Sequence, residues 1–265
     1  MNDAVSPGMF DVIRDRLRDI ADEEDVRILL AVESGSRAWG FHSPDSDYDV
    51  RFIYARPLDW HFRLDKRRDV IERPIDDELD LSGWELSKAL CLAVGSNAVI
   101  AEWLQSPIRY LADDQAVEEL RGFAKRALDR KAVTWHYLSL LRRQQARLRG
   151  PDGGVRIKRY FYVLRPALAL RWMRLNDAAM PPMDMPELRA GCDLDALTSE
   201  ALKTLTAKKM VVQERAEVMV AEPILDALVA DEVASAERWL AESGRTDPRD
   251  LWGEANALHQ KFSLG

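Results

Sequence analysis

The spacing of hydrophobic residues in the first third of the chain changes from a helical period to a strand period. Between residues 9 and 21 apolar side chains recur at intervals of three and four, which predicts an amphipathic helix. The apolar run at 26–32 predicts a buried strand, and the sequence Ser34-Gly35-Ser36 that follows predicts a tight turn. A helix, a strand and a glycine turn therefore open the chain.

Residues 47–55 predict a second strand, because apolar and polar side chains alternate along DYDVRFIYA. Alternation with a period of two puts Asp47 and Asp49 on the same face of this strand. The segment 76–81, DDELDL, predicts a further strand on which Asp76, Glu78 and Asp80 share a face. Two of the three predicted strands thus carry acidic side chains in a regular arrangement.

The pattern beyond residue 85 is mostly helical, with predicted helical stretches at 113–148 and 155–176 separated by the glycine-proline loop RGPDGG. The proline-rich segment PPMDMPE, near residue 181, interrupts the helical remainder. We therefore expect an α+β protein, with a mixed sheet flanked by helices in residues 1–110 and an all-helical domain in residues 111–265.

Composition narrows the class of protein without naming a function. A chain of 265 residues with 47% hydrophobic content can build a core, and its net charge of -7 disfavours attraction of the whole molecule to nucleic acid or anionic membrane. Cys91 and Cys192 are far apart and no C-x-x-C occurs, so neither a disulfide framework nor a zinc site is indicated. No leader or membrane-spanning run is apparent. We expect a reduced, cytoplasmic protein without a membrane partner, whose oligomeric state the sequence leaves open.

Charge is distributed unevenly along the chain. Between Arg121 and Arg174 there are fifteen Lys and Arg residues and only two acidic residues, Asp129 and Asp152. Such runs are usually solvated helix faces, but the size of this excess favours a surface that faces an anion.

The stretch ESGSRAWGFHSPDSDYDV combines two features of phosphate chemistry. A glycine after a strand lets the backbone approach a ligand, and the amides and hydroxyl that follow can hold phosphate oxygens. Eleven residues after Ser36 come Asp47 and Asp49, whose carboxylates project from one strand face about 7 Å apart and suit a pair of divalent ions. Phosphate cradle and paired metal ligands together indicate phosphoryl transfer.

This pattern resembles the DNA polymerase β nucleotidyltransferase superfamily. Within it, the segments GSRAWGFHSPDSDYDVRFIYARPLDW, LDLSGWELSKAL, AEWLQSPIRY and KRYFYVLRPALALRW resemble the RlaP family of RNA-ligase-associated, predicted nucleotidyltransferases. The resemblance covers about residues 29–175. It implies an enzyme that binds an NTP, such as ATP, with two Mg²⁺ or Mn²⁺ ions, transfers NMP to an acceptor hydroxyl and releases pyrophosphate.

The resemblance also implies roles for particular residues. Gly35 and Ser36 would hold the β- and γ-phosphates, Asp47 and Asp49 would bridge two metals, and Asp80 would be the third metal carboxylate. Four further candidates for nucleotide contacts are Arg37, Lys88, Lys158 and, by stacking on a base, Tyr162. For Arg37 and Lys88, a surface charge without a ligand is an equally good interpretation. A tyrosine in such a helix is more often part of the hydrophobic core than a partner for a base.

The acceptor stays open between three hypotheses. An RNA 3′ end in repair or end processing agrees with the resemblance and with the basic block. Transfer to a protein or to a small molecule such as an aminoglycoside is the second hypothesis. The third is a catalytically silent nucleotide-binding module of the antitoxin-like regulatory kind, which the intact Gly35, Ser36, Asp47 and Asp49 argue against. The chain has no P-loop, dinucleotide or hydrolase-elbow motif and no H-x-x-x-H pair.

Overall fold

The structure is a computed structural model, and it describes residues 4–65, 67–74, 78–149, 154–211, 218–219, 222–244 and 250–264. By contacts the chain forms two compact units, and each is described by itself below. The first unit comprises residues 1–38, 47–128 and 248–265, and the second comprises residues 39–46 and 129–247. The division into domains at residues 110 and 111 stays a prediction.

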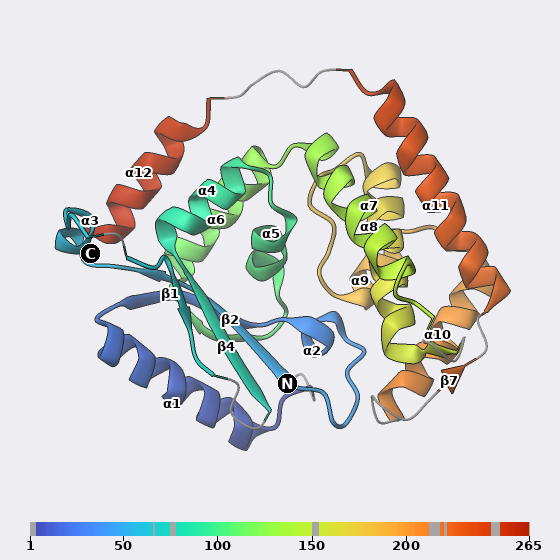
Figure 1. Cartoon of the computed structure of the whole chain (residues 1–265), viewed down its shortest axis with the longest axis horizontal. Coiled ribbons are helices and arrows are strands. Elements are labelled where there is room, and N and C mark those ends of the chain that lie inside the picture. The colour runs from blue at the N-terminus through green and yellow to red at the C-terminus, as the bar shows by residue number, and fades with distance from the viewer. Residues whose placement is uncertain are drawn as a thin grey trace. The chain divides into compact units, whose positions relative to one another are not determined.

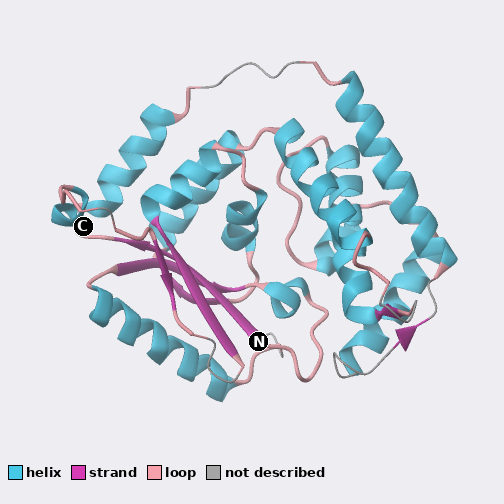
Figure 2. Ribbon diagram, in the orientation of Figure 1, coloured by secondary structure: helices cyan, strands magenta, loops and turns pink. Residues whose placement is uncertain are grey.

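The first unit is built on a five-stranded mixed sheet in the order β3-β4-β2-β1-β5 (Figures 1 and 2). Its strands are β1 (Arg27–Glu33), β2 (Tyr48–Ala55), β3 (Val70–Glu72), β4 (Leu79–Glu85) and β5 (Arg109–Ala112). Strands β2 and β4 pair in parallel, whereas the β1–β2, β1–β5 and β3–β4 pairs are antiparallel. The parallel pair lies at the centre of the candidate site.

Helices cover both faces of this sheet. Helix α1 (Pro7–Glu24) covers one face, where its buried residues join a core with the alternate residues Val50, Phe52 and Tyr54 of β2. The other face packs against α4 (Leu86–Val94), α5 (Ala98–Gln105), α6 (Asp114–Ala127) and α12 (Trp252–Ser263). Two short helices, α2 (Gly35–Trp39) and α3 (Leu58–His61), connect the early strands. Asp49 and Arg51 therefore point away from α1.

The second unit is helical apart from a two-stranded ribbon. It contains α7 (Arg130–Gln145), α8 (Ile157–Asn176), α9 (Met185–Ala190), α10 (Ala196–Val211) and α11 (Pro223–Glu242), with strands β6 (Val155–Arg156) and β7 (Val218–Met219). None of the helices that the structure describes is long and apolar enough to cross a membrane. A mixed sheet flanked by helices together with a helical second part confirms the expected α+β class.

Several predicted elements have different limits in the structure. The strand expected at 76–81 begins at Leu79, and residues 76 and 77 lie outside the described residues. That strand continues to Glu85, because Gly83 and Trp84 pair with Phe52 and Ile53 of β2. The expected helical stretch 113–148 is two helices, since the side chain of Asp129 accepts a hydrogen bond from the Ala132 amide and starts α7 anew.

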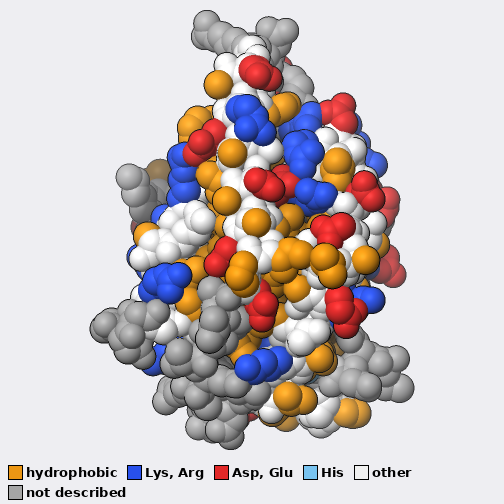
Figure 3. All heavy atoms as spheres, turned by 90° about the vertical axis from the view of Figure 1, so that its right-hand side faces the viewer, with side chains coloured by type: hydrophobic (Ala, Val, Ile, Leu, Met, Phe, Trp, Pro, Cys, Tyr) orange, Lys and Arg blue, Asp and Glu red, His pale blue; other side chains and the backbone are white. Residues whose placement is uncertain are grey.

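Many side chains of the basic block have acidic partners within their own unit. Arg171 and Arg174 both pair with Glu232, whose side chain is 1% exposed. Three further arginines also pair with acidic residues that lie after residue 174 in the chain. The pairs are Arg126 with Glu254, Arg130 with Asp177 and Arg142 with Glu237. On the face drawn in Figure 3, basic and acidic side chains are interspersed. For these residues the basic block is structural, because acids from later in the chain neutralise it.

We predict that Gly83→Ala lowers the free energy of unfolding by about 1–3 kcal/mol. A Cβ on Gly83 would lie 2.1 Å from Cε2 of Phe52, so the ring would have to move out of the core. Urea unfolding would measure the loss. Adding Phe52→Leu to the variant removes the ring edge that clashes, so the double variant should lose less stability than the two single losses added together; simple additivity would contradict the explanation.

Candidate active site

Two carboxylates meet across the parallel strand pair. Asp49 of β2 and Asp80 of β4 are direct neighbours in the register. The guanidinium of Arg51 lies between them, with Nη2 donating to Oδ1 of Asp49 at 3.2 Å and to Oδ2 of Asp80 at 2.7 Å. Its Nη1 donates to the backbone carbonyls of Val50 and Asp80, each at 3.0 Å. Arg51 therefore fixes both carboxylates and offsets their mutual repulsion.

The glycine turn touches the same carboxylate pair. Gly35 begins α2 with φ of +59°, a conformation that disfavours any residue with a Cβ. A Cβ built there would lie 2.0 Å from Oδ2 of Asp49, so only glycine leaves room for that oxygen. The Ser34 amide donates to the Asp49 carbonyl at 2.7 Å, which ties the turn to β2, and the buried Ser36 follows Gly35 in α2.

Asp47 lies one residue before β2 and is exposed to solvent. Its backbone is fixed from two sides, since its carbonyl accepts a hydrogen bond from Nε of Arg37 and the following Tyr48 amide donates to the Glu78 carbonyl. Arg37 itself is buried, and its guanidinium lies 3.8 Å from the centre of the Tyr48 ring. In the structure Arg37 therefore positions Asp47, and its contact with a nucleotide stays a prediction.

The fully buried carboxyl group of Glu33 is hydrogen-bonded to the backbone of the candidate site. Oε1 of Glu33 accepts a hydrogen bond from the Asp49 amide at 2.9 Å, and Oε2 accepts one from the Tyr110 hydroxyl at 2.6 Å. Burial raises the pKa of Glu33 to about 7, although both hydrogen bonds favour the ionised form. Glu33 thus links the end of β1 to the backbone of the residue that carries one site carboxylate.

A cavity of about 750 Å³ opens beside the carboxylates, and its lining includes Ser34, Arg51 and Asp80. Trp84 and Trp103 form another part of its wall, and their rings stack with centroids 3.9 Å apart. A cavity of this size with an aromatic wall and a polar end has the character of a small-ligand site.

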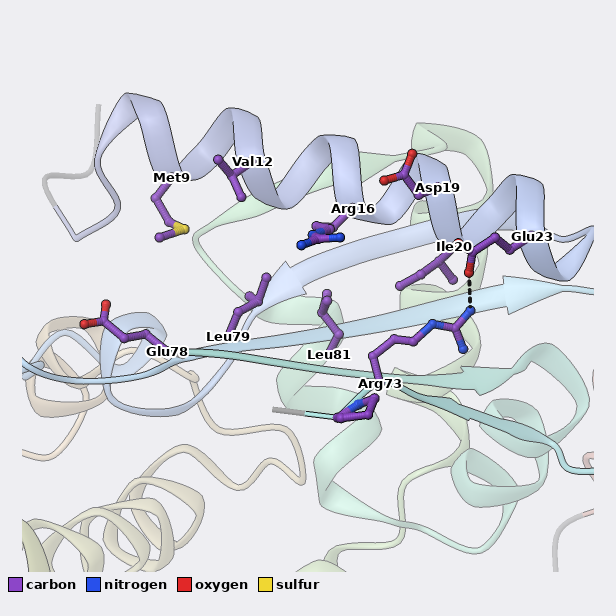
Figure 4. Close-up of a pocket in the computed structure, with 11 residues that line it drawn as sticks. Met9, Val12, Arg16, Asp19, Ile20, Glu23, Arg73, Glu78, Leu79 and Leu81 are labelled. Atoms are coloured by element: carbon purple, nitrogen blue, oxygen red, sulfur yellow. Dashed lines mark hydrogen bonds and ion pairs between the residues drawn. The ribbon is translucent and has the colours of Figure 1, made fainter. Parts of the chain in front are cut away.

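A second, larger groove lies on the opposite side of the sheet, between α1 and β4 (Figure 4). Leu79 and Leu81 point into it, and Arg73 crosses it to an ion pair with Glu23. Because neighbouring side chains alternate along a strand, Asp80 faces away from this groove. The groove is therefore separate from the carboxylate pair.

Three other expected site residues lie away from the carboxylates or in the second unit. Lys88 follows the far end of β4 and pairs with Asp69 at 3.0 Å. Lys158 and Tyr162 lie on α8 in the second unit, where the Tyr162 ring packs edge-on against Trp39 at 5.6 Å. Their roles in nucleotide binding stay predictions.

Sequence reasoning missed several residues of this arrangement. In the sequence, Arg51 is only one of the polar positions that alternate along β2. Its bond to Asp80 could not be predicted, because it depends on the pairing of β2 with β4. Glu33 stands directly before the glycine turn at the end of an apolar run, which is a signal for a buried acid. The aromatic wall of Trp84 and Trp103 had no comparable signal, because it joins two elements.

Comparison with known proteins identifies the family. The sequence profile described as the RNA repair pathway DNA polymerase beta family, RlaP, matches residues 9–261. The chain belongs to the RlaP family. As an RlaP protein it is a nucleotidyltransferase of the polymerase β type, an enzyme class that generally uses an NTP and divalent metal ions.

Two individual proteins are similar to this chain, at different levels of identity. The RlaP chain is 41% identical over 253 residues to the uncharacterized protein YcgL of Bacillus subtilis, and the match covers 93% of each sequence. A crystal structure of a nucleotidyltransferase-like protein from Exiguobacterium sibiricum matches 86% of this chain and 74% of its own, with 14% identity and a TM-score of 0.30.

We predict that Gly35→Ala abolishes nucleotidyl transfer and lowers stability, because the new Cβ would displace the Asp49 carboxylate and the backbone would be strained. Gly8→Ala, in α1 with open space around the new Cβ, is the matched control and should keep activity with equal or higher stability. Thermal unfolding and product formation are the measurements. Full activity in Gly35→Ala would contradict the close approach of turn and carboxylate.

We predict that the metal-free protein loses stability through Glu33 as the pH rises. The folded-state pKa of Glu33, about 7, is raised from 4.5, so this stability is fully present below about pH 4.5 and is lost as the pH rises through about 7. The raised pKa corresponds to about 3 kcal/mol.

Urea unfolding at pH 5 and pH 8, with EDTA present, tests this by comparing the parent with Glu33→Gln. The amide cannot ionise, so the variant should gain stability relative to the parent at pH 8 compared with pH 5. Parallel pH dependences in the two proteins would show that Glu33 does not titrate in this range.

Proposed function

We propose that the protein is a Mg²⁺-dependent nucleotidyltransferase that moves NMP from an NTP to the 3′ hydroxyl of RNA and releases pyrophosphate. The observation that carries the proposal is the in-register pair of Asp49 and Asp80 beside the turn at Gly35. Family membership supports the reaction class, and the family description supports the connection to RNA repair.

The donor set suits hard divalent cations. Asp47, Asp49 and Asp80 offer carboxylate oxygens only, which are the ligands that Mg²⁺ and Mn²⁺ prefer. Arg51 bonds Oδ1 of Asp49 and Oδ2 of Asp80, so both carboxylates are held on one face of the strand pair, where divalent cations would bind. Two bound ions would stabilise the charge that develops on the attacking and leaving oxygens.

The chain itself would then do three things. Gly35 and Ser36 would bring backbone amides and a hydroxyl to the phosphates, since the absence of a Cβ at Gly35 allows close approach. Asp80 would orient the acceptor hydroxyl through the metal nearest to it. The stacked Trp84 and Trp103 would present an aromatic wall of the adjoining cavity to a base.

Fewer observations support RNA as the acceptor than support the nucleotidyl transfer reaction. The basic block gives it little support, because Arg126, Arg130, Arg142, Arg171 and Arg174 have carboxylate partners. The family description is its main support. A cytoplasmic location agrees with this role and likewise remains a prediction.

We predict that Asp49→Asn lowers the rate of nucleotidyl transfer at least about a thousandfold, because the amide is a weak metal ligand and removes one of the two carboxylates that Arg51 bonds. Asp80→Asn should have a similar effect. The assay supplies Mg²⁺ or Mn²⁺, each labelled NTP in turn and a mixed RNA pool, and follows pyrophosphate and labelled product. Asp11→Asn, an exposed aspartate on α1, is the matched control and should retain the parent rate.

The position of the label distinguishes the acceptors. Extended RNA 3′ ends support the proposal, whereas label on protein or on a small molecule such as an aminoglycoside would replace RNA as the acceptor. NTP binding without pyrophosphate release for any acceptor would indicate a catalytically silent module and would overturn the proposal.

A further inference from the structure

A second group of candidate metal ligands lies in the first unit, apart from the aspartates of the candidate active site. One nitrogen each from His61 and His259 and one carboxylate oxygen of Glu85 lie within 4.8 Å of one another. His61 is the last residue of α3, Glu85 the last residue of β4, and His259 belongs to α12. Segments nearly two hundred residues apart in sequence therefore bring their polar side chains together at one place.

The polar atoms of this cluster lack hydrogen-bond partners although they are buried. Nε2 of His61, Nε2 of His259 and Oε1 of Glu85 are all inaccessible to solvent and accept or donate no hydrogen bond. The Glu85 side chain is fully buried, and its other oxygen, Oε2, accepts a hydrogen bond from the Ser87 amide at 2.6 Å. Within the described part of the chain, neither Lys nor Arg forms an ion pair with Glu85. Three unsatisfied buried polar atoms in one cluster destabilise the folded state unless a ligand binds them.

The rings of His61 and His259 lie close together and nearly perpendicular to each other. Their ring centroids lie 4.7 Å apart at an interplanar angle of 87°.

We propose that His61, Glu85 and His259 bind one Zn²⁺ ion that fastens helix α12 to the sheet of the first unit. Two imidazoles and one carboxylate are a known zinc donor set, which leaves the fourth tetrahedral position to water. Zinc ligands at about 2.0–2.2 Å from the metal lie about 3.3 Å from one another, so small side-chain rotations close the cluster around the ion.

The donor chemistry separates this site from the carboxylate pair. Mg²⁺ prefers oxygen ligands, whereas imidazole nitrogens favour zinc and other transition metals. The zinc site is also structural in position, because α12 already packs through Ala255, Leu258 and Phe262 into the core below α4 and α6. If zinc binds the folded state and not the unfolded state, the free energy of zinc binding is added to the stability of the folded state.

The test uses the full-length protein after treatment with a chelator and dialysis. Elemental analysis after incubation with zinc chloride should find about one tightly bound zinc per chain. Zinc should raise the midpoint of thermal unfolding by about 5 °C or more at saturating concentration. His61→Ala and His259→Ala should each lose both the bound zinc and the shift, with unchanged far-UV circular dichroism.

Two control variants locate the ion. Asp49→Asn, at the carboxylate pair, and His136→Ala, on α7 in the second unit, should both keep the zinc and the thermal shift. Loss of zinc in Asp49→Asn with retention in His61→Ala and His259→Ala would overturn the proposal, because the ion would then sit at the aspartates.

A measurement on the unmodified protein keeps the test decisive if a histidine variant does not fold. Co²⁺ in a tetrahedral site with nitrogen ligands gives visible absorption bands. These bands should appear on addition of one equivalent, disappear on addition of Zn²⁺ and persist in excess Mg²⁺. No visible bands, or displacement by Mg²⁺, would overturn the assignment.

Discussion

The register between β2 and β4 is the constraint on which the candidate site depends. It places Asp49 opposite Asp80 and Phe52 opposite Gly83, so the polar end and the packed middle of the strand pair are fixed together. A slip of one residue would turn Asp80 to the face of α1, where Leu79 and Leu81 now pack. The fit of the Phe52 ring over Gly83 therefore helps to hold the two carboxylates on one face.

Negative charge exceeds positive charge at the site, because Arg51 bonds both Asp49 and Asp80 while the Glu33 carboxyl lies directly behind Asp49. A Glu33 carboxyl with a pKa of about 7 is partly protonated at neutral pH, which limits the negative charge that Arg51 has to offset. A divalent cation bound at the carboxylates would offset more of this negative charge. The scaffold thus tolerates three acidic groups in close proximity by keeping one of them buried and partly neutral.

The local pattern of the sequence predicted much of the fold and part of the site. Alternation along β2 placed Asp49 correctly on the polar face, and the apolar run before Ser34 predicted β1. The local sequence pattern could not predict which distant segments pair with each other. The basic block is the clearest case, since its count stopped at Arg174 while its partners, such as Glu232, come from later helices. The strand β5 was missed because four residues are too few to show a period.

The two groups of candidate metal ligands share strand β4, so a metal bound at the imidazole cluster would affect the position of Asp80 in the candidate active site. Asp80 lies near the start of β4 and Glu85 is its last residue, so the strand rise separates them by about 17 Å. An ion held by Glu85, His61 and His259 would immobilise the end of β4 and anchor it to α12. A strand fixed at that end and paired with β2 along its length has little freedom to shift register. The geometry of Asp80 would then be supported by a metal whose chemistry differs from that of the cations at the carboxylates.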